Sequence, residues 1–295
     1  MGKDLVAQFE SARNRFAEAA DILGFDLAAT CFEGPEDALK QTRVTQPALY
    51  VHSCILTELL AERGIRPDAA AGHSLGEYSA LYSAGAFTFV DGLRLVKARA
   101  EAMQKAGTTN PGTMAAVVGL DEDAVRDICY ELESSGVVVP ANYNSPGQLV
   151  ISGEINAVRK AVEMARAQGA KLARELPVSG AFHSPLMKPA AMALAEALSS
   201  AALSQPRVTV ISNVTAKPHT DVNTLRNLLA QQLLSPVRWT ESVLELSNLG
   251  DVRWLEVGSG TVLAGLLKRI IKGATAIPVG TAEDLSKLES SAGVQ

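Results

Sequence analysis

A chain of 295 residues, 47% hydrophobic and 20% charged, has the composition of a globular protein with one large domain or two smaller ones. The formal net charge of −5 argues against general nucleic-acid binding and no apolar run is long enough to span a bilayer, so we expect neither nucleic acid nor membrane as a partner. The three cysteines are widely spaced and form no Cys-x-x-Cys pair, which excludes a disulfide framework or a cysteine metal site and fits a cytoplasmic protein.

The first sixty or so residues are predicted to be helical. Apolar residues recur at helical spacing over residues 4–24, and the pattern ends near Gly24. A second helical pattern follows Pro47 and is broken at Gly64. His52 falls within this second helix, where a histidine is most simply part of the core or of the surface.

The sequence Gly-x-Ser-x-Gly spans residues 72–76, after a run of small residues and before a predicted helix that ends near Gly85. This order is typical of a nucleophile elbow, in which a serine occupies a tight strand-to-helix turn. We expect Gly72 and Gly76 to leave room for close backbone contacts, and Ser74 to present Oγ beside the Leu75 N–H, a candidate oxyanion donor. The alternative is an ordinary Gly-Ser turn between a strand and a helix.

The next predicted helix, residues 91–105, carries one residue that does not fit its surroundings. Arg99 lies in the middle of the apolar face, where a guanidinium is costly unless an anion meets it. One interpretation is a structural salt bridge, or an arginine whose charged end reaches the edge of the core. The other is a planar donor pair for a substrate carboxylate.

Between residues 112 and 179 the pattern changes. The predicted strands are residues 114–120, 137–140, 148–151 and 171–178, and the predicted helices are residues 121–134 and 155–168. The order strand-helix-strand-strand-helix-strand is that of a ferredoxin-like unit. We therefore expect an α/β protein in which a small domain, residues 112–179, is inserted into a large domain formed by residues 1–111 and 180–295.

Among the four histidines, His183 is the best candidate for a general base acting on Ser74, because it lies where a strand gives way to a loop. His219 lies in a polar turn and His73 adjoins the serine. A plain surface histidine is the alternative for His183.

Two features of the C-terminal part complete the pattern. The glycine-rich turn at residues 258–261 precedes a helix, which is where phosphate binds in some proteins, but it lacks the ending of a P-loop and we interpret it as a tight turn. The chain after Ala282 is expected to be peripheral.

Taken together, these segments resemble the malonyl-CoA:acyl-carrier-protein transacylases of fatty-acid synthesis, over nearly the whole chain. The matching segments are residues 72–81, Arg99, residues 144–148, residues 181–184, residues 231–233 and residues 256–258. The resemblance implies an α/β-hydrolase-like large domain, with a mostly parallel sheet, and an inserted ferredoxin-like domain. It also implies malonyl-CoA and a phosphopantetheinylated acyl carrier protein as partners, no metal or other cofactor, and a monomer.

The resemblance also implies a role for each site residue. Ser74 is the nucleophile, His183 its base, and the Leu75 N–H an oxyanion donor. Arg99 and Gln232 are the substrate-binding positions: Arg99 binds the malonyl carboxylate, and the Gln232 backbone carbonyl orients His183. Residues 181–184 resemble the malonyl-selective version of the family.

One departure from the family concerns the start of the chain. The family begins with a strand and a loop that supplies a second oxyanion donor, and neither has a counterpart here. We therefore expect a shortened form of a longer protein, or a weakly active and unstable one. A serine esterase or thioesterase and an inactive carrier-protein-docking homologue remain as alternatives. A basic cluster of Lys171, Arg174 and Lys188 is predicted to meet an acidic carrier protein.

Overall fold

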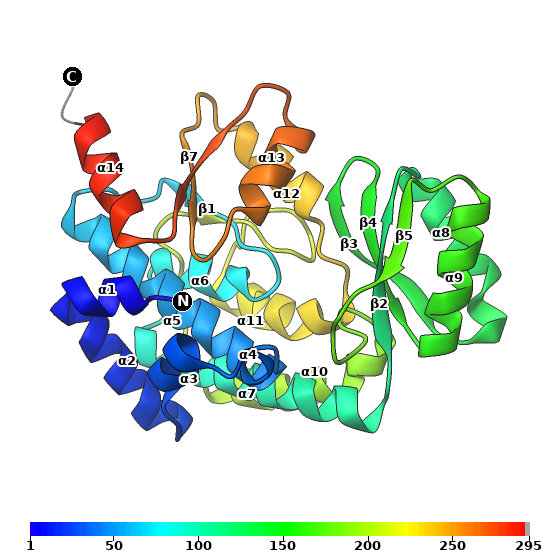
Figure 1. Ribbon diagram of the computed structural model, residues 1–295, viewed down its shortest axis with the longest axis horizontal. Coiled ribbons are helices and arrows are strands. Elements are labelled where there is room, and N and C mark those ends of the chain that lie inside the picture. The colour runs from blue at the N-terminus through cyan, green and yellow to red at the C-terminus, as the bar shows by residue number, and fades with distance from the viewer. Residues whose placement is uncertain (293–295) are drawn as a thin grey trace.

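Helices form the N-terminal part of the computed structural model, which describes residues 1–292 (Figure 1). They are α1 (Lys3–Gln8), α2 (Glu10–Leu23), α3 (Leu27–Glu33), α4 (Glu36–Leu39) and α5 (Thr42–Glu62). The single helix predicted over residues 4–24 is two helices, because Phe9 between them has extended backbone, with φ −118° and ψ 127°. The helix predicted after Pro47 begins earlier, at Thr42, since a proline near the start of a helix removes only one backbone hydrogen bond.

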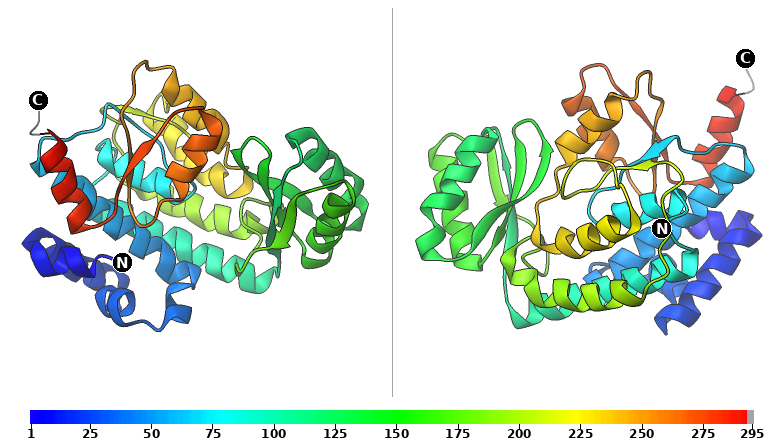
Figure 2. Two further views of the ribbon diagram at one scale, coloured as in Figure 1. Left: turned by 45° about the horizontal axis from the view of Figure 1, so that its top comes forward. Right: turned by 180° about the vertical axis from the view of Figure 1, so that it is seen from behind.

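The large domain contains two pairs of parallel strands that pack against helices (Figure 2). Strand β1 (Ala69–Ala70) pairs with β6 (Thr209–Val210), and β7 (Trp254–Val257) pairs with β8 (Ala276–Val279), a strand that the sequence pattern did not predict. The other helices of this domain are α6 (Gly76–Ser83), α7 (Phe89–Thr109), α10 (Lys188–Ser200), α11 (Val222–Gln231), α12 (Trp239–Ser247), α13 (Val262–Ile270) and α14 (Ala282–Ala292), with short 3₁₀ turns η2 (Pro185–Met187) and η3 (Gln232–Leu234).

A four-stranded antiparallel sheet with two helices on one face forms the small domain, drawn in green in Figure 1. Its elements are β2 (Thr113–Val118), α8 (Glu122–Glu131), η1 (Glu133–Ser135), β3 (Val138–Ser145), β4 (Gln148–Gly153), α9 (Ile155–Ala167) and β5 (Leu172–Glu175), and the strands lie in the order β3-β4-β2-β5. The predicted βαββαβ order and the α/β class are confirmed. We propose residues 112–179 as the bounds of this domain and residues 1–111 and 180–295 as the large domain.

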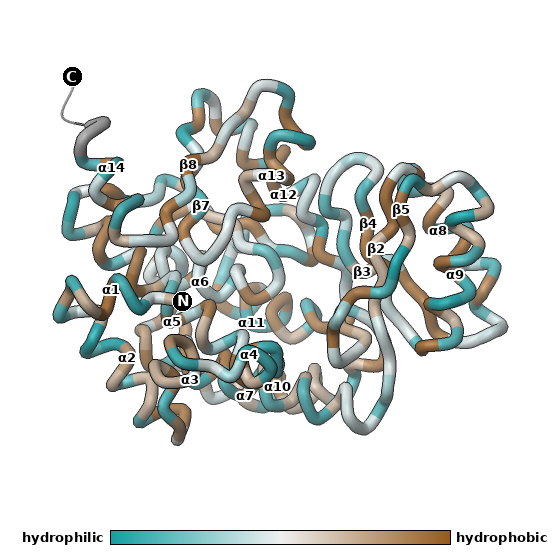
Figure 3. Tube along the Cα trace, in the orientation of Figure 1, coloured by the Kyte–Doolittle hydropathy of each residue, from teal (hydrophilic) through white to brown (hydrophobic). Residues whose placement is uncertain are grey.

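Apolar side chains gather in a large core around α5, α7 and α10 and in a separate core beneath α8 and α9. Figure 3 shows apolar positions alternating with polar ones along the helices, as expected where one face is buried. Among residues 1–292, no helix has the length and apolarity needed to cross a membrane. The same residues hold no group of three or more His, Cys, Asp or Glu side chains placed to bind a metal ion.

The prediction that the chain after Ala282 is peripheral is wrong. Helix α14 buries Leu285 and Leu288 in the large core, and the Ala282 N–H donates to Asp4 Oδ2 at 2.8 Å. The two ends of the described chain therefore pack together, and α14 adjoins α1 (Figure 1).

Candidate active site

Ser74 lies in the turn between β1 and α6 and has a positive φ of 52°. This left-handed conformation is uncommon for a residue with a side chain and needs support from its surroundings. Asn213 provides it: its Oδ1 accepts from the Ser74 N–H at 2.7 Å, and its Nδ2 donates to the Gly72 carbonyl at 2.7 Å. One amide side chain thus joins both sides of the turn that presents Ser74.

The two glycines of the turn differ in what they do. A Cβ atom at Gly72 would lie 1.9 Å from the carbonyl carbon and oxygen of Gly76, so only glycine fits there. A Cβ atom at Gly76 would meet nothing within 4 Å. The prediction that both glycines leave room for close contacts is therefore correct for Gly72 and wrong for Gly76.

This difference predicts opposite outcomes for two alanine substitutions. Gly72→Ala should lower the free energy of unfolding by about 3 kcal/mol, because backbone must move to relieve the overlap. Gly76→Ala, the matched control, should change it by less than about 0.5 kcal/mol. Urea unfolding of both variants measures this, and equal losses would show that the close approach at Gly72 does not constrain the turn.

His183 also has a positive φ, 58°, and lies in the loop between β5 and η2. Its Nε2 is 2.8 Å from Ser74 Oγ, and its Nδ1 is 2.9 Å from the Gln232 carbonyl and 3.1 Å from the Ser235 carbonyl. Because two carbonyl oxygens face Nδ1, the proton belongs on Nδ1 and Nε2 is free to accept the hydroxyl proton. Two backbone carbonyls take the place that a carboxylate holds in many serine enzymes.

Burial, and then the nearby Arg99, lowers the pKa of His183 to about 3. Hydrogen bonds from Nδ1 to the two carbonyls raise the pKa of His183, but by less than burial lowers it. His183 is therefore a neutral imidazole at neutral pH, the form that a general base requires.

Arg99 extends from α7 to the serine and is 1% exposed. Its Nη2 donates to Ser74 Oγ at 2.9 Å and to Gln232 Oε1 at 2.9 Å, while its Nη1 donates to Gln46 Oε1. All of these partners are neutral, and within residues 1–292 Arg99 forms no ion pair and its Nε has no partner. A buried guanidinium without a counter-ion in direct contact is therefore available to an anion that reaches Ser74. The structural salt bridge considered from the sequence is absent from this part of the chain.

Leu75 follows the serine at the start of α6, with helical φ −55° and ψ −36°. In the described residues its backbone N–H donates to no acceptor, as is usual for the first N–H groups of a helix. The structure thus places one free donor directly after Ser74.

The Gln232 side chain is fully buried and already bonded. Its Nε2 donates to the Ser74 carbonyl at 3.0 Å and to Glu77 Oε2 at 2.6 Å, and its Oε1 accepts from Arg99. The polar atoms of this side chain are thus all bonded to Ser74, Arg99 and Glu77, and only its backbone carbonyl reaches His183. Its place among the substrate-binding positions does not agree with this geometry.

Sequence reasoning missed three residues of this network. Asn213 and Glu77 carry no motif of their own, although Glu77 is a charged residue next to a buried tyrosine in a helix that follows the serine. His219, predicted to lie in a polar turn, is buried, and its Nε2 is 2.9 Å from Glu77 Oε1. A carboxylate on an otherwise apolar helix was the available signal for this buried pair.

The small domain contacts the site through β3. Asn144 Oδ1 is 2.9 Å from Nε2 of His73, the residue before Ser74. The N–H of Tyr143 donates to the Val237 carbonyl at 2.9 Å, and the Val237 N–H donates to Ala141 at 2.9 Å. Residues 232–237, whose Gln232 and Ser235 carbonyls accept from His183, are thus attached to β3 at the edge of the small domain's sheet.

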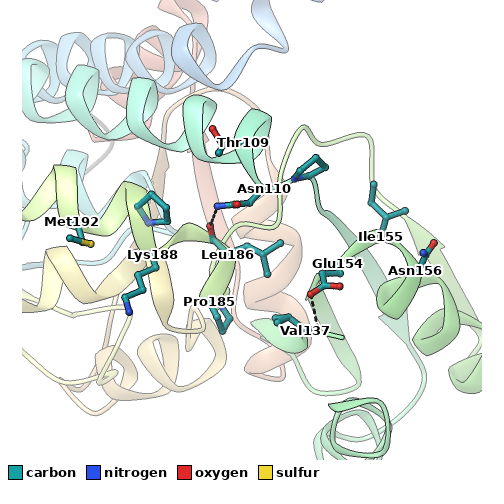
Figure 4. A pocket seen from close by; sticks show the side chains of 12 residues that line it. Thr109, Asn110, Val137, Glu154, Ile155, Asn156, Pro185, Leu186, Lys188 and Met192 are labelled. Atoms are coloured by element: carbon teal, nitrogen blue, oxygen red, sulfur yellow. Dashed lines mark hydrogen bonds between the residues drawn. The ribbon is translucent and has the colours of Figure 1, made fainter. Parts of the chain in front are cut away.

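A cleft of about 790 Å³ lies between the end of α7, the start of α10 and the small domain (Figure 4). Pro185 and Leu186 link it to the loop of His183, and Asn110 Nδ2 donates to the Leu186 carbonyl at 3.4 Å. Neither Ser74 nor Arg99 lines it. The cleft therefore adjoins the loop of His183 without including the Ser74 hydroxyl or the Arg99 guanidinium.

The basic cluster predicted from the sequence is not one cluster. Lys171 lies beside the end of β2 at Val118, whereas Lys188 lines the cleft near the other end, where Thr113 begins the strand. These two ends are roughly 17 Å apart, because a strand rises about 3.3 Å per residue. Charge reversal at Lys171 and at Lys188 would therefore alter separate surfaces, whereas Arg174 pairs with Ala116 between the two ends.

A carboxylate of the protein itself lies at the helix start that follows the glycine-rich turn at residues 258–261. Glu256 accepts from the backbone N–H groups of Leu263 at 2.9 Å and Ala264 at 2.7 Å. The protein's own anion thus occupies the start of α13, in agreement with the interpretation as a tight turn and not a phosphate site.

Comparison with known proteins agrees with this geometry. The model of the acyl transferase domain family matches residues 1–287. The chain is 44% identical to the malonyl CoA-acyl carrier protein transacylase of Escherichia coli (strain K12), over 92% of this chain and 89% of that protein. It superposes with a TM-score of 0.94 on the acyl-carrier-protein-S-malonyltransferase of Bartonella henselae, at 44% identity over 100% of this chain and 95% of that one.

A further solved structure is a malonyl-transacylase in complex with its type II polyketide synthase acyl-carrier protein, with a TM-score of 0.95 and 41% identity over 99% of this chain and 94% of that one. The resemblance inferred from the motifs is thus confirmed over more than nine-tenths of the chain. The chain belongs to the malonyl CoA-acyl carrier protein transacylases of the acyl transferase family.

Proposed function

We propose that this protein transfers the malonyl group of malonyl-CoA to the phosphopantetheine thiol of an acyl carrier protein, for fatty-acid or polyketide synthesis. The observation that carries the proposal is the position of Ser74 Oγ, 2.8 Å from His183 Nε2 and 2.9 Å from Arg99 Nη2. One hydroxyl is thus next to a neutral base and to a buried cation. The names of the relatives, and the carrier protein bound in one related structure, support malonyl-CoA and a carrier protein as partners.

The first half-reaction forms a malonyl ester on Ser74. Oγ attacks the thioester carbonyl while His183 Nε2 takes the hydroxyl proton, and the oxyanion that forms lies near the Leu75 N–H. When the C–S bond breaks, the protonated His183 returns its proton to the CoA sulfur. In the second half-reaction His183 takes the proton of the phosphopantetheine thiol, and the sulfur attacks the ester. When the C–O bond breaks, His183 returns this proton to Ser74 Oγ, which restores the free hydroxyl.

Arg99 supplies selectivity in this proposal. The free carboxylate of a malonyl group is two carbons from the ester carbonyl, so a malonyl ester on Ser74 brings it close to the guanidinium that now contacts Oγ. An acetyl group would leave the buried cation unpaired, and a site with an unpaired buried charge discriminates strongly.

A thiol-release assay with malonyl-CoA separates this function from the alternatives. The proposal predicts one rapid equivalent of CoA per protein, and steady turnover only when a phosphopantetheinylated carrier protein is added. Continuous release without the carrier would show a thioesterase. No release, together with carrier binding, would show an inactive docking protein.

His183→Ala is expected to slow single-turnover acylation by at least about 10²-fold, the usual effect of losing a general base. Stopped-flow measurement of CoA release from malonyl-CoA tests this. An acylation rate near that of the parent protein would remove His183 from the mechanism.

The low pKa of His183 predicts how acylation depends on pH. Since the pKa is lowered from 6.5 to about 3, the imidazole stays neutral and the acylation rate should remain flat from about pH 8 to about pH 5. The unfolded chain binds this proton more readily, so the stability that a neutral His183 contributes is present above about pH 6.5 and is lost as the pH falls toward 3. A pH–rate profile with an inflection near 6.5 would contradict the neutral buried base.

We also propose a cytoplasmic monomer. Three free, buried cysteines support the cytoplasmic location. Sedimentation equilibrium of the purified protein tests the oligomeric state.

A further inference from the structure

Glu77 is a buried carboxylate directly behind the nucleophile. It lies in the first turn of α6 and is 1% exposed. Three donors converge on it: His219 Nε2 at 2.9 Å, Gln232 Nε2 at 2.6 Å and the Asn213 N–H at 3.2 Å. With donors on both oxygens, the carboxylate is suited to carry its negative charge inside the protein.

The carboxylate determines which way the Gln232 amide points. The two hydrogens of Nε2 face Glu77 Oε2 and the Ser74 carbonyl, both of which only accept. Oε1 must then face Arg99, from which it accepts at 2.9 Å. The amide of Gln232 thus connects Glu77 to Arg99 in a fixed orientation.

His219 does not cancel the charge of Glu77. Its Nε2 faces the carboxylate, while its Nδ1 is buried and has no hydrogen-bond partner within residues 1–292. A protonated imidazole would leave an N–H group buried and unpaired at Nδ1, which is costly. The neutral tautomer with its proton on Nε2 pairs that nitrogen with Glu77 and leaves an unpaired acceptor at Nδ1, not an unpaired N–H group of a buried cation. In this form the pair keeps a net negative charge.

Glu77 therefore acts on Arg99 through the Gln232 amide, without direct contact. Burial lowers the pKa of Arg99, and the charge of Glu77 is among the effects that raise it again. Because the carboxylate does not touch the guanidinium, the unpaired Nε is left for another anion. A direct ion pair would instead have to be broken each time a substrate carboxylate entered.

We propose that Glu77 is a positioning residue that sets the strength of carboxylate binding by Arg99: it orients Gln232 against the guanidinium and supplies a counter-charge that does not compete for the substrate's place. The inference rests on the proposed function, in which Arg99 binds the malonyl carboxylate. It goes beyond that function by assigning selectivity to a group that never touches substrate.

The test compares the binding of malonyl-CoA and acetyl-CoA, by calorimetry, on a Ser74→Ala background in which no acyl-enzyme forms. Glu77→Gln removes the charge and keeps the shape: its oxygen accepts from Gln232, and its amide faces His219, whose proton then moves to Nδ1. Because Nδ1 has no partner within residues 1–292, this variant should also be less stable, and its Tm is measured beside the binding constants. Loss of a negative charge roughly 10 Å from the substrate carboxylate should lower the malonyl-CoA Kd about tenfold. The acetyl-CoA Kd should stay unchanged, whereas general damage to the site would weaken both.

A second variant changes the charge on the other side of Arg99 and does not touch Glu77. Gln46→Glu places a carboxylate directly on the guanidinium, in place of the oxygen that already accepts from Nη1. It should raise the malonyl-CoA Kd about tenfold or more and leave the acetyl-CoA Kd unchanged. His219→Gln, which keeps a neutral donor toward Glu77, is the matched control and should leave both constants near those of the background.

The outcomes are distinguishable. If the Ser74→Ala background itself binds malonyl-CoA no better than acetyl-CoA, the proposed function of Arg99 fails. If the background discriminates but Glu77→Gln leaves the malonyl-CoA Kd unchanged or raises it, the role of Glu77 is overturned. Should Glu77→Gln not fold, as judged by its Tm, Gln46→Glu decides: an unchanged malonyl-CoA Kd would show that a direct counter-charge does not compete, which contradicts the proposal.

Discussion

Replacing Ser74 with alanine is expected to lower malonyl transfer from malonyl-CoA to a phosphopantetheinylated acyl carrier protein by more than about 10⁴-fold. The hydroxyl contacts both His183, the proposed base, and the buried guanidinium of Arg99, so without it neither group has a reacting atom to act on. The fold should survive, because the backbone of the turn is held by Asn213 and not by the serine side chain. The measurement is the rate of formation of malonyl-carrier protein.

Ser259→Ala is the matched control for this change. Ser259 is exposed and lies in another glycine-rich turn, so its loss should leave transfer unchanged. If the Ser74→Ala protein, with an unchanged Tm, still transferred malonyl groups at a rate close to that of the parent, Ser74 would not be the acyl carrier of this enzyme.

Replacing Arg99 with alanine is expected to change the substrate preference. The kcat/KM for malonyl-CoA should fall by about 10²-fold or more, because the malonyl carboxylate would enter a buried site without its cation. Transfer of an acetyl group should be kept or increased, since acetyl has no charge to pair. Initial rates with both thioesters, at equal enzyme concentration, measure the ratio.

Arg94→Ala provides the control on the same helix. Arg94 is on the solvent side of α7, 3.9 Å from Asp91, and its loss should affect neither thioester. Equal losses of malonyl and acetyl transfer in Arg99→Ala would mean that the arginine serves the structure of the site and not the recognition of substrate.

Local patterns in the sequence were enough to predict the elements that carry the site. The spacing of glycines around Ser74, the arginine on an apolar helix face and a loop histidine each stand out against their neighbours. The structure brings the arginine and the histidine within hydrogen-bond distance of the Ser74 hydroxyl. The βαββαβ order of the small domain could also be predicted from the sequence, because clear turn signals separate its strands and helices.

The parts that were missed depend on contacts between distant segments. Glu77, Asn213 and His219 meet only after the chain has folded, across more than 130 residues, and no local periodicity marks such a meeting. The same holds for α14, which is amphipathic but short and is buried by helices from the other end of the chain. The role expected of Gly76 failed for a different reason: the Gly-x-Ser-x-Gly pattern does not tell which glycine approaches the backbone.

Ser74 is proposed to carry the malonyl group between the thiols of CoA and of the carrier protein. Peptide-level mass spectrometry of the parent protein, quenched shortly after mixing with malonyl-CoA, locates the acyl group. We predict one malonyl ester per chain, located on Ser74, that disappears when a phosphopantetheinylated carrier protein is added and reappears as a thioester on the carrier. A malonyl group on a different residue, or release of CoA with no acylated peptide at any time, would contradict the account.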